Sequence, residues 1–399
     1  MTAPDFRIRQ PQDLIAVAAE LVGFRPERSV VCVAVRHDRR SAAIRCDLPP
    51  DPRRRDGELA VTRALDAMLQ RVGAVEAVVV IVYPPETFAA ERGIPRPTLG
   101  RSVHSALARA GHPVVDVLCV AGDGWGSYLD DGCPREGRPL EEVEASPLAA
   151  RQTVRSAATP DSLAALPRVD AGFARAVRDA CDAVFDRLRH PRGAAFGPAG
   201  TSGDAREVPD PVELVEELVG WEPGRADAAR LGRLLAVLQV PSHRDVVLLQ
   251  VAFGRDVGLV AAEREEVYAL RRLVTGRAMD DLVAEDLARG PHADDVVLQD
   301  LLMGCGGRTP DVRRIDAAIE VLRLLVACAE PEDRVDPLCI LAWLSWARGR
   351  GSIAAAYLDR AGEIDPGHGM ADVLRAIIGA GRVPEWSYLE PDDEPVPAT

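Results

Sequence analysis

The run AVEAVVVIVY, residues 74–83, constrains the fold more than any other segment of the chain. It is nearly continuous in β-branched residues, with no regular alternation between polar and apolar side chains. Such a run is typical of a strand that is buried on both faces. A sheet that contains it needs helices packed against it, so the segments around the run decide the fold class.

The surrounding segments alternate between helical and β-like patterns. Apolar residues follow helical spacing in residues 11–24, 58–73 and 98–111, and β-like segments occupy residues 29–36, 41–49 and 113–122. Gly73 and Gly111 stand where two of the helices should end, and Thr98 stands where one should begin. This order predicts an α/β N-terminal domain, residues 1–190, with a mixed or mostly parallel sheet and helices packed against it.

The second half of the chain differs from the first in composition and in the spacing of its apolar residues. Residues 191–211 are rich in Pro, Gly, Ser and Ala and lack an apolar period, which predicts a flexible linker. Residues 212–386 read as an all-α domain, and residues 387–399 as a disordered acidic tail. The last hairpin, residues 337–364, resembles the tetratricopeptide template. It is either a peptide-binding groove or an ordinary helical hairpin that closes the domain.

Composition excludes several functions. The chain has no Lys and no Asn, which removes a Walker lysine, a Schiff-base lysine and an N-glycosylation acceptor. Its net charge of −14 argues against a nucleic-acid partner. No signal segment is visible, and the apolar runs fall short of the roughly 18 residues that a membrane span needs. We therefore expect a cytoplasmic protein without a membrane partner.

The sequence also gives no sign of a metal or a cofactor. The eight Cys are scattered without a CxxC pair, and no His/Cys spacing matches a zinc site. The G-x-G-x-G in AGDGWGSY, residues 121–128, has β-like residues on both sides of Asp123-Gly124, which favours a hairpin turn over a nucleotide loop. We expect no bound metal and no cofactor.

Several polar residues follow the predicted strands, and open α/β sheets place ligands at the carboxyl ends of their strands. The candidates for a pocket there are Tyr83, Glu86, Asp123, Trp125, Tyr128 and Cys133. Each also has a structural interpretation. The YPPE segment can be a Pro-rich strand exit, and Cys133 is reactive only if a His or a helix N-terminus lies beside it.

The segment LVGFRPERSVV, residues 21–31, carries a second group of candidates. Gly23 and Pro26 are helix-stop residues, and the cluster Arg25, Glu27, Arg28 and Ser29 precedes a strand. We expect this cluster on the edge of the sheet opposite to a catalytic site, as a structural connector. A functional loop is the alternative.

The segment SHRD, residues 242–245, provides Arg244 and Asp245. It resembles a capping box, with Ser242 at the N-cap and a carboxylate three residues later, so helix initiation explains it. An additional role for Arg244 and Asp245 is the alternative.

The motifs LVGFRPERSVVCVAV, PSHRDVVLL and ILAWLSWARGRGSIAAAYLDRAGEIDPGHGMADVLRAIIGAG together resemble domain-of-unknown-function family 4192 over residues 7–386. The resemblance implies a soluble protein of high-GC Gram-positive bacteria, and it implies no activity. Members of the family tend to carry a Cys-Cys-Pro turn. Here Cys133 and Pro134 match it, but Gly132 stands in place of the first Cys, which puts any function of a cysteine pair in doubt.

Two classes of function remain. The first is a binding or regulatory protein that contacts another protein through its C-terminal helices. The second is an enzyme of unassigned class with a pocket at the strand ends of the α/β domain. Convergent polar groups in a deep pocket at those strand ends would favour the enzyme.

Overall fold

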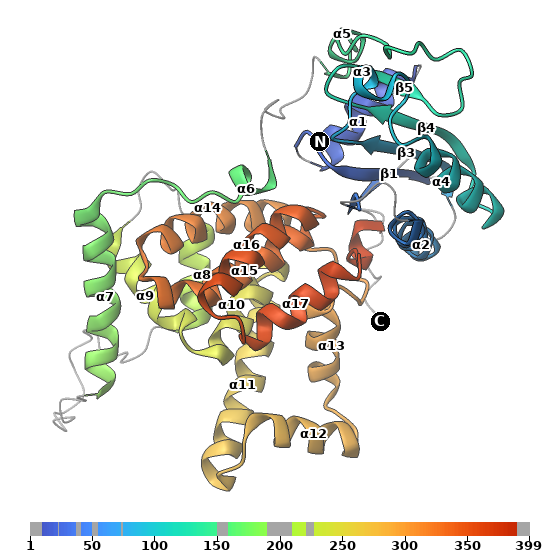
Figure 1. Ribbon diagram of the computed structural model, residues 1–399. Helices are drawn as coiled ribbons and strands as arrows, with labels where there is room; N and C mark the ends of the chain where they lie inside the picture. Colours follow the sequence, from blue (N-terminus) through green and yellow to red (C-terminus); the bar gives the residue numbers. More distant parts are fainter. Residues whose placement is uncertain are drawn as a thin grey trace, which may run out of the picture. The chain divides into compact units, whose positions relative to one another are not determined.

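The computed structural model of the chain (Figure 1) describes residues 10–22, 24–36, 41–49, 55–72, 75–149, 159–189, 210–220 and 227–388. The chain forms two compact units, which divide between Leu163 and Ala164. Residues 379–382 belong with the first unit. Nearly all of the expected linker and of the expected acidic tail lies outside the described residues.

The first unit is an α/β domain, as the sequence predicts. Its elements in chain order are α1 Pro11–Val22, β1 Ser29–Arg36, β2 Ser41–Asp47, α2 Arg55–Val72, β3 Val75–Tyr83, α3 Phe88–Glu91, α4 Pro97–Arg109, β4 Val114–Val120, β5 Trp125–Ser127, α5 Glu141–Glu144 and α6 Pro160–Leu163.

The five strands form one mixed sheet in the order β2-β1-β3-β4-β5. Strands β3 and β4 are parallel, and the other neighbouring pairs are antiparallel. In the pairing of β1 with β3, Ser29 lies opposite Tyr83. The start of β1, the ends of β3 and β4 and the start of β5 therefore meet at the same edge of the sheet.

Helices cover both faces of this sheet, which explains why β3 lacks alternation. On one face Val31, Ile81 and Leu118 pack against Leu14 and Ile15 of α1. The alternate residues of the same strands are also buried, and α2 and α4 contact the sheet from the other side (Figure 1). Both sets of side chains are removed from water, so the sequence signal is a continuous apolar run.

The second unit is all-helical. Its elements are α7 Ala171–Arg189, α8 Pro211–Val219, α9 Ala228–Leu238, α10 Pro241–Phe253, α11 Arg255–Thr275, α12 Met279–Arg289, α13 Ala293–Leu302, α14 Val312–Cys328, η3 Pro331–Arg334, α15 Val335–Ala347, α16 Gly351–Ile364, α17 Gly369–Gly379 and η4 Glu385–Tyr388.

Helix α7 belongs to this second unit, so the division falls earlier in the chain than the expected boundary near residue 190. The reason is close packing between α7 and α9. At Gly232 of α9, an added Cβ would come within 2.5 Å of the Cβ of Ala180 in α7. Val177 and Cys181 are buried on the same helix.

The core of the helical unit contains a cluster of aromatic side chains. Phe253, Trp343, Trp346 and Trp386 have ring centroids 5.5–6.4 Å apart, mostly in edge-to-face arrangements. The indole of Trp343 donates to the carbonyl of Leu302 at 2.8 Å. Helix α15, which carries Trp343 and Trp346, is the first helix of the expected C-terminal hairpin and is buried on nearly all sides.

Two further observations complete the fold. The capping-box interpretation of SHRD is wrong: α10 begins at Pro241 with Val240 at its N-cap, so Ser242 already lies inside the helix. Proline at the first helical position fixes the start of the helix instead. Within the described part of the chain, every helix is too short or too polar to cross a membrane.

Candidate functional site

A pocket of about 110 Å³ lies in the first unit, at the edge of the sheet where β3 and β4 end. Its walls come from α1, the segment before β1, the two strand ends and the segment that includes α5. The lining residues are Ile15, Ala16, Ala19, Arg25, Pro26, Tyr83, Val120, Leu140, Val143, Glu144 and Ala149.

Three buried polar groups that have no hydrogen-bond partner within the described residues lie at this end of the sheet. They are the Tyr83 hydroxyl, the Ser29 hydroxyl and the indole N–H of Trp125. Ser29 lies opposite Tyr83 in the ladder, so the two side chains project from the same face. Trp125 packs in the same core cluster as Tyr83. An unpaired buried polar group costs roughly 1–3 kcal/mol, so three of them at one place indicate a site that a ligand or water completes.

Arg25 adds a positive charge to the pocket. Burial raises the pKa of Tyr83 far above its usual value, and the charge of Arg25 offsets only part of that rise. The hydroxyl of Tyr83 therefore remains protonated at neutral pH and is available as a donor. The Arg25 guanidinium and the protonated Tyr83 phenol line the pocket together with one carboxylate, that of Glu144. The two donors favour a ligand group that accepts hydrogen bonds, and Arg25 favours one that carries negative charge.

The expectation that the Arg25 cluster lies on the opposite edge is wrong. It assumed that β1 runs in the same direction as the other strands, but β1 is antiparallel to β3. The first residues of β1 therefore lie at the same edge of the sheet as the last residues of β3 and β4. Arg25 lines the pocket, and Ser29 is buried beside it in the sheet.

Glu27 and Arg28 do not line the pocket and are exposed. Arg28 adopts a left-handed conformation with φ of 47°. Its carbonyl accepts a hydrogen bond from the backbone N–H of Leu48 at 2.9 Å. Through this bond Arg28 joins the start of β1 to the segment that follows β2.

Glu86 forms a bidentate ion pair with Arg96, at distances of 2.8 and 2.9 Å. Arg96 is buried and also donates to the carbonyl of Pro49. The hydrogen bond from Arg96 is the main reason why the pKa of Glu86 is lowered. Glu86 therefore anchors the loop that follows β3 and is already fully engaged.

Asp123 closes the hairpin that its Asp-Gly sequence predicts. The backbone N–H of Ala121 donates to the carbonyl of Gly124 at 2.9 Å, and β4 and β5 are antiparallel. The carboxylate of Asp123 accepts hydrogen bonds from the backbone of Phe88 and Ala89 at 2.9 and 3.0 Å. These contacts join the hairpin to α3.

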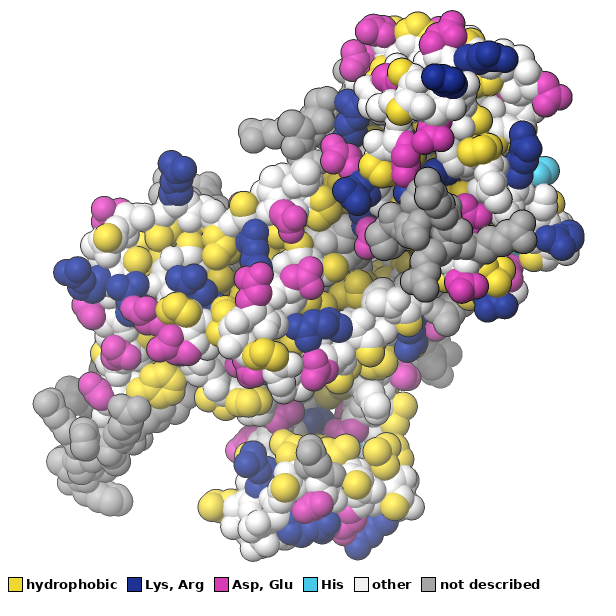
Figure 2. Space-filling model, viewed as in Figure 1, with side chains coloured by type: hydrophobic (Ala, Val, Ile, Leu, Met, Phe, Trp, Pro, Cys, Tyr) yellow, Lys and Arg dark blue, Asp and Glu magenta, His cyan; other side chains and the backbone are white. Residues whose placement is uncertain are grey.

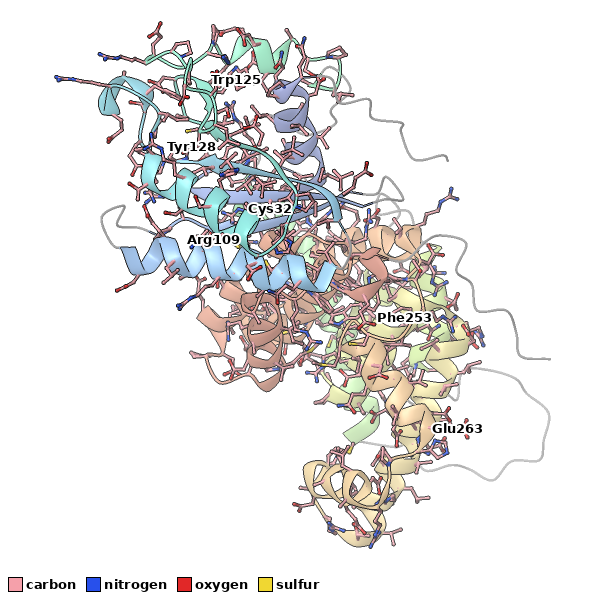
Figure 3. The ribbon with its side chains drawn as sticks, turned by 90° about the vertical axis from the view of Figure 1, so that its right-hand side faces the viewer. Cys32, Arg109, Trp125, Tyr128, Phe253 and Glu263 are labelled. Carbon is pink, nitrogen blue, oxygen red and sulfur yellow. The ribbon has the colours of Figure 1, made fainter. Side chains whose placement is uncertain are left out.

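Tyr128 and Cys133 pack in a different cluster, around Phe88. The hydroxyl of Tyr128 donates to the carbonyl of Pro95, and its ring covers Gly100 of α4. Burial raises the pKa of the Cys133 thiol, so it is not a thiolate. Figure 3 labels Trp125 and Tyr128, which belong to these two separate clusters.

Arg244 and Asp245 lie in the helical unit and do not contribute to this pocket. Arg244 forms an ion pair with Asp336 of α15 at 2.6 Å and a second one with Asp245 at 3.2 Å. His368 also contacts Asp336, at 3.2 Å. The network ties α10 to α15.

Of the candidates, Arg25 and Tyr83 line the pocket, and Ser29 and Trp125 are buried near Tyr83 at the same end of the sheet. Sequence reasoning missed the rest of the lining, above all Leu140, Val143 and Glu144, which come from the chain beyond β5. The only feature of the sequence that could have indicated them is the pair Leu140 and Val143, which stand three residues apart, as on one face of a helix, within a polar segment. Within the described residues, no group of three or more His, Cys, Asp or Glu side chains is placed to hold a metal ion.

Comparisons with known proteins identify the family of the chain but no individual relative. No curated protein and no solved structure matches the chain. The family model described as "Domain of unknown function (DUF4192)" matches residues 11–289 and 258–385, and these two overlapping segments include both the sheet-end pocket and the helical unit. The chain therefore belongs to the DUF4192 family.

Proposed function

We propose that this protein is a binding protein whose N-terminal unit holds a small carboxylate-bearing molecule in the sheet-end pocket. The observation that supports this is that Tyr83, whose buried hydroxyl has no partner within the described residues, lines the pocket together with Arg25. Ser29 and Trp125, whose polar groups are also buried and unpartnered there, lie at the same end of the sheet. A carboxylate would accept hydrogen bonds from Tyr83 and Trp125 and pair with the charge of Arg25.

The apolar part of the lining limits the rest of the ligand. Ile15, Val120, Leu140 and Val143 provide an apolar wall next to these donors. The pocket of about 110 Å³ is smaller than the cavity of about 150 Å³ that accepts benzene in another protein. The ligand is therefore a small acid whose apolar body is smaller than a benzene ring, on the scale of a short branched chain.

An enzyme is the second candidate, because the pocket lies at the carboxyl ends of two parallel strands, where α/β enzymes place their sites. Its buried, protonated Tyr83 would serve as a proton donor in that case. Incubation of the bound acid with the protein, followed by mass spectrometry, distinguishes the two. A binding protein returns the acid unchanged.

A cytoplasmic location is part of this proposal. All eight Cys are free thiols, and free thiols persist in a reducing compartment. Contact with another protein through the C-terminal helices also remains a proposal, and the surface that favours it is described in the next subsection.

A binding experiment on the full chain tests the pocket. The protein is labelled with 5-fluorotryptophan, and its fluorine NMR spectrum is recorded. The signal of Trp125 is the one that is missing from the spectrum of the Trp125→Phe variant. A panel of small carboxylic acids is then titrated. We expect at least one acid to shift the Trp125 signal and to raise the melting temperature, whereas the matching amides do neither.

Two variants locate the effect. Arg25→Gln should abolish the shift, because it removes the charge that pairs with the carboxylate. Arg28→Gln, three residues away and exposed, is the matched control and should bind as the wild type does. The proposal fails if no acid moves the Trp125 signal, or if both arginine variants bind equally well.

A further inference from the structure

Helices α11, α12 and α13 form an arm whose interior is polar (Figure 1). Arg264 pairs with Asp295 through two hydrogen bonds of 2.7 and 2.9 Å. The buried Tyr268 donates to Asp286, and Arg271 pairs with the same carboxylate. The three helices are thus held together by charged and polar contacts.

The outside of the arm carries several large exposed apolar side chains among its charged ones. The exposed fractions are 60% for Leu270, 82% for Leu273, 76% for Val274, 57% for Leu287 and 55% for Val297. Figure 2 shows yellow side chains gathered over the arm, at the bottom of the view. Clustered exposed apolar side chains on a folded protein mark a surface that a partner covers.

Helix α11 provides the most regular part of this surface. Leu259, Leu270 and Leu273 lie on its outer face together with the exposed Glu263 and Glu266, at the spacing i, i+4, i+7, i+11 and i+14. The opposite face carries Arg264, Tyr268 and Arg271 toward the other helices of the arm. Figure 3 labels Glu263 on this helix.

The charges along α11 are ordered. On the outer face Glu263 and Glu266 precede the two leucines at positions 270 and 273, and Arg277 lies just past the end of the helix. When two such helices meet in antiparallel orientation around Leu270 and Leu273, the acidic part of one lies beside Arg277 of the other. The same surface is then complementary to itself, as a two-fold interface requires.

We propose that the outer face of α11 binds the same face of a second copy of this chain, in antiparallel orientation about a two-fold axis. Leu270 and Leu273 form the apolar centre, and Glu266 of each copy pairs with Arg277 of the other. Arg277 now pairs with Glu285, which also pairs with Arg289. Arg277 can therefore turn to a second copy without leaving Glu285 unpaired. This inference is independent of the proposed ligand pocket.

Sedimentation velocity of the full chain over a wide concentration range tests the proposal. We expect a monomer–dimer equilibrium in the wild type and a monomer in the double variant Leu270→Glu with Leu273→Glu. Glu is a good helix former, so circular dichroism should show unchanged helix content. The matched control is Leu59→Glu on α2, where Leu59 is 47% exposed, and it should dimerise as the wild type does.

A charge-reversal pair tests the orientation and the identity of the partner. One variant carries Glu263→Arg and Glu266→Arg, and the other carries Arg277→Glu. Each alone should dimerise more weakly than the wild type, and an equimolar mixture should recover the association as a heterodimer. A wild type that stays monomeric, a leucine variant that still dimerises, or a mixture no stronger than its components would each refute the proposal.

Discussion

Tyr83 illustrates how one side chain can contribute to function at a cost in stability. It is 4% exposed, its hydroxyl has no partner among the described residues, and burial keeps it protonated. A phenylalanine would fill the same space without the unpaired hydroxyl. A ligand that accepts a hydrogen bond from this hydroxyl would offset that cost.

The first prediction follows from this argument. Tyr83→Phe should raise the free energy of unfolding of the N-terminal unit by about 1 kcal/mol in the absence of ligand, because it removes an unsatisfied buried group. The same variant should weaken binding of the small acid. Urea unfolding and the fluorine titration measure the two effects. A variant that is destabilised by several kcal/mol would show that the hydroxyl has a structural partner.

The second prediction concerns Glu86. Its pKa is lowered by the hydrogen bond with Arg96, so the folded state holds the ionised form. The stabilisation is present above the ordinary pKa of a glutamate, about 4.3, and is lost as the pH falls through the lower folded-state value. Glu86→Gln should cost about 1.5–3 kcal/mol at pH 7, and its difference from the wild type should shrink in acid. Unfolding curves between neutral and acidic pH check this. An equal difference at every pH would contradict it.

At the scale of elements, much of the N-terminal unit is predictable from sequence. The apolar run before Tyr83 gives a strand buried on both faces, and Asp123-Gly124 gives a hairpin. The order and direction of the strands cannot be predicted in the same way, because the pairing partner of a strand depends on the whole sheet. The direction of β1 was therefore not predictable, and Arg25 was assigned to the wrong edge.

The candidate site was predictable only in part for the same reason. Tyr83 and Trp125 follow or begin strands and could be proposed from position alone. Glu86 and Asp123 have the same position, yet they are engaged by Arg96 and by the backbone of α3. Sequence position identifies polar residues near a strand end, but only packing determines which of them remain unpaired.

The third prediction concerns helix α11. Burial, and then the nearby carboxylates of Asp245 and Asp295, raise the pKa of Glu265 to about 7, and one of its oxygens is buried without a partner. The folded state therefore binds a proton more tightly than the unfolded state. Its contribution to stability is complete below about pH 4.5 and is lost as the pH rises through about 7.

Glu265→Gln removes this ionisation. We expect it to stabilise the helical unit at pH 8 relative to the wild type, on the order of 1–3 kcal/mol, and to have little effect at pH 4.5. Thermal unfolding at the two pH values measures the difference. The exposed Glu363→Gln on α16 is the control and should leave stability at both pH values within about 0.5 kcal/mol of the wild type. A Glu265 variant that is less stable at pH 8 would contradict the argument.

At the scale of the whole molecule, the division into two compact units predicts two separable unfolding events. The helical unit has its own core, in which Trp346 contacts Trp343 and Trp386 with ring centroids 6.0 and 6.2 Å apart. The N-terminal unit has a separate core around the sheet. Damage to one core should therefore leave the other unit folded.

Trp346→Ala tests this directly. Trp346 is 2% exposed, and its ring fills the space above Gly304, where an added Cβ would come within 2.4 Å of it. Truncation to alanine leaves a cavity and should cost roughly 3–5 kcal/mol of helical-unit stability. In the fluorotryptophan-labelled protein, the signals of Trp343 and Trp386 should then collapse at a lower temperature, while the Trp125 signal keeps its wild-type melting temperature. Simultaneous loss of all these signals would show that the two units unfold as one cooperative structure, because an independent N-terminal unit has no reason to respond to a cavity beside Gly304.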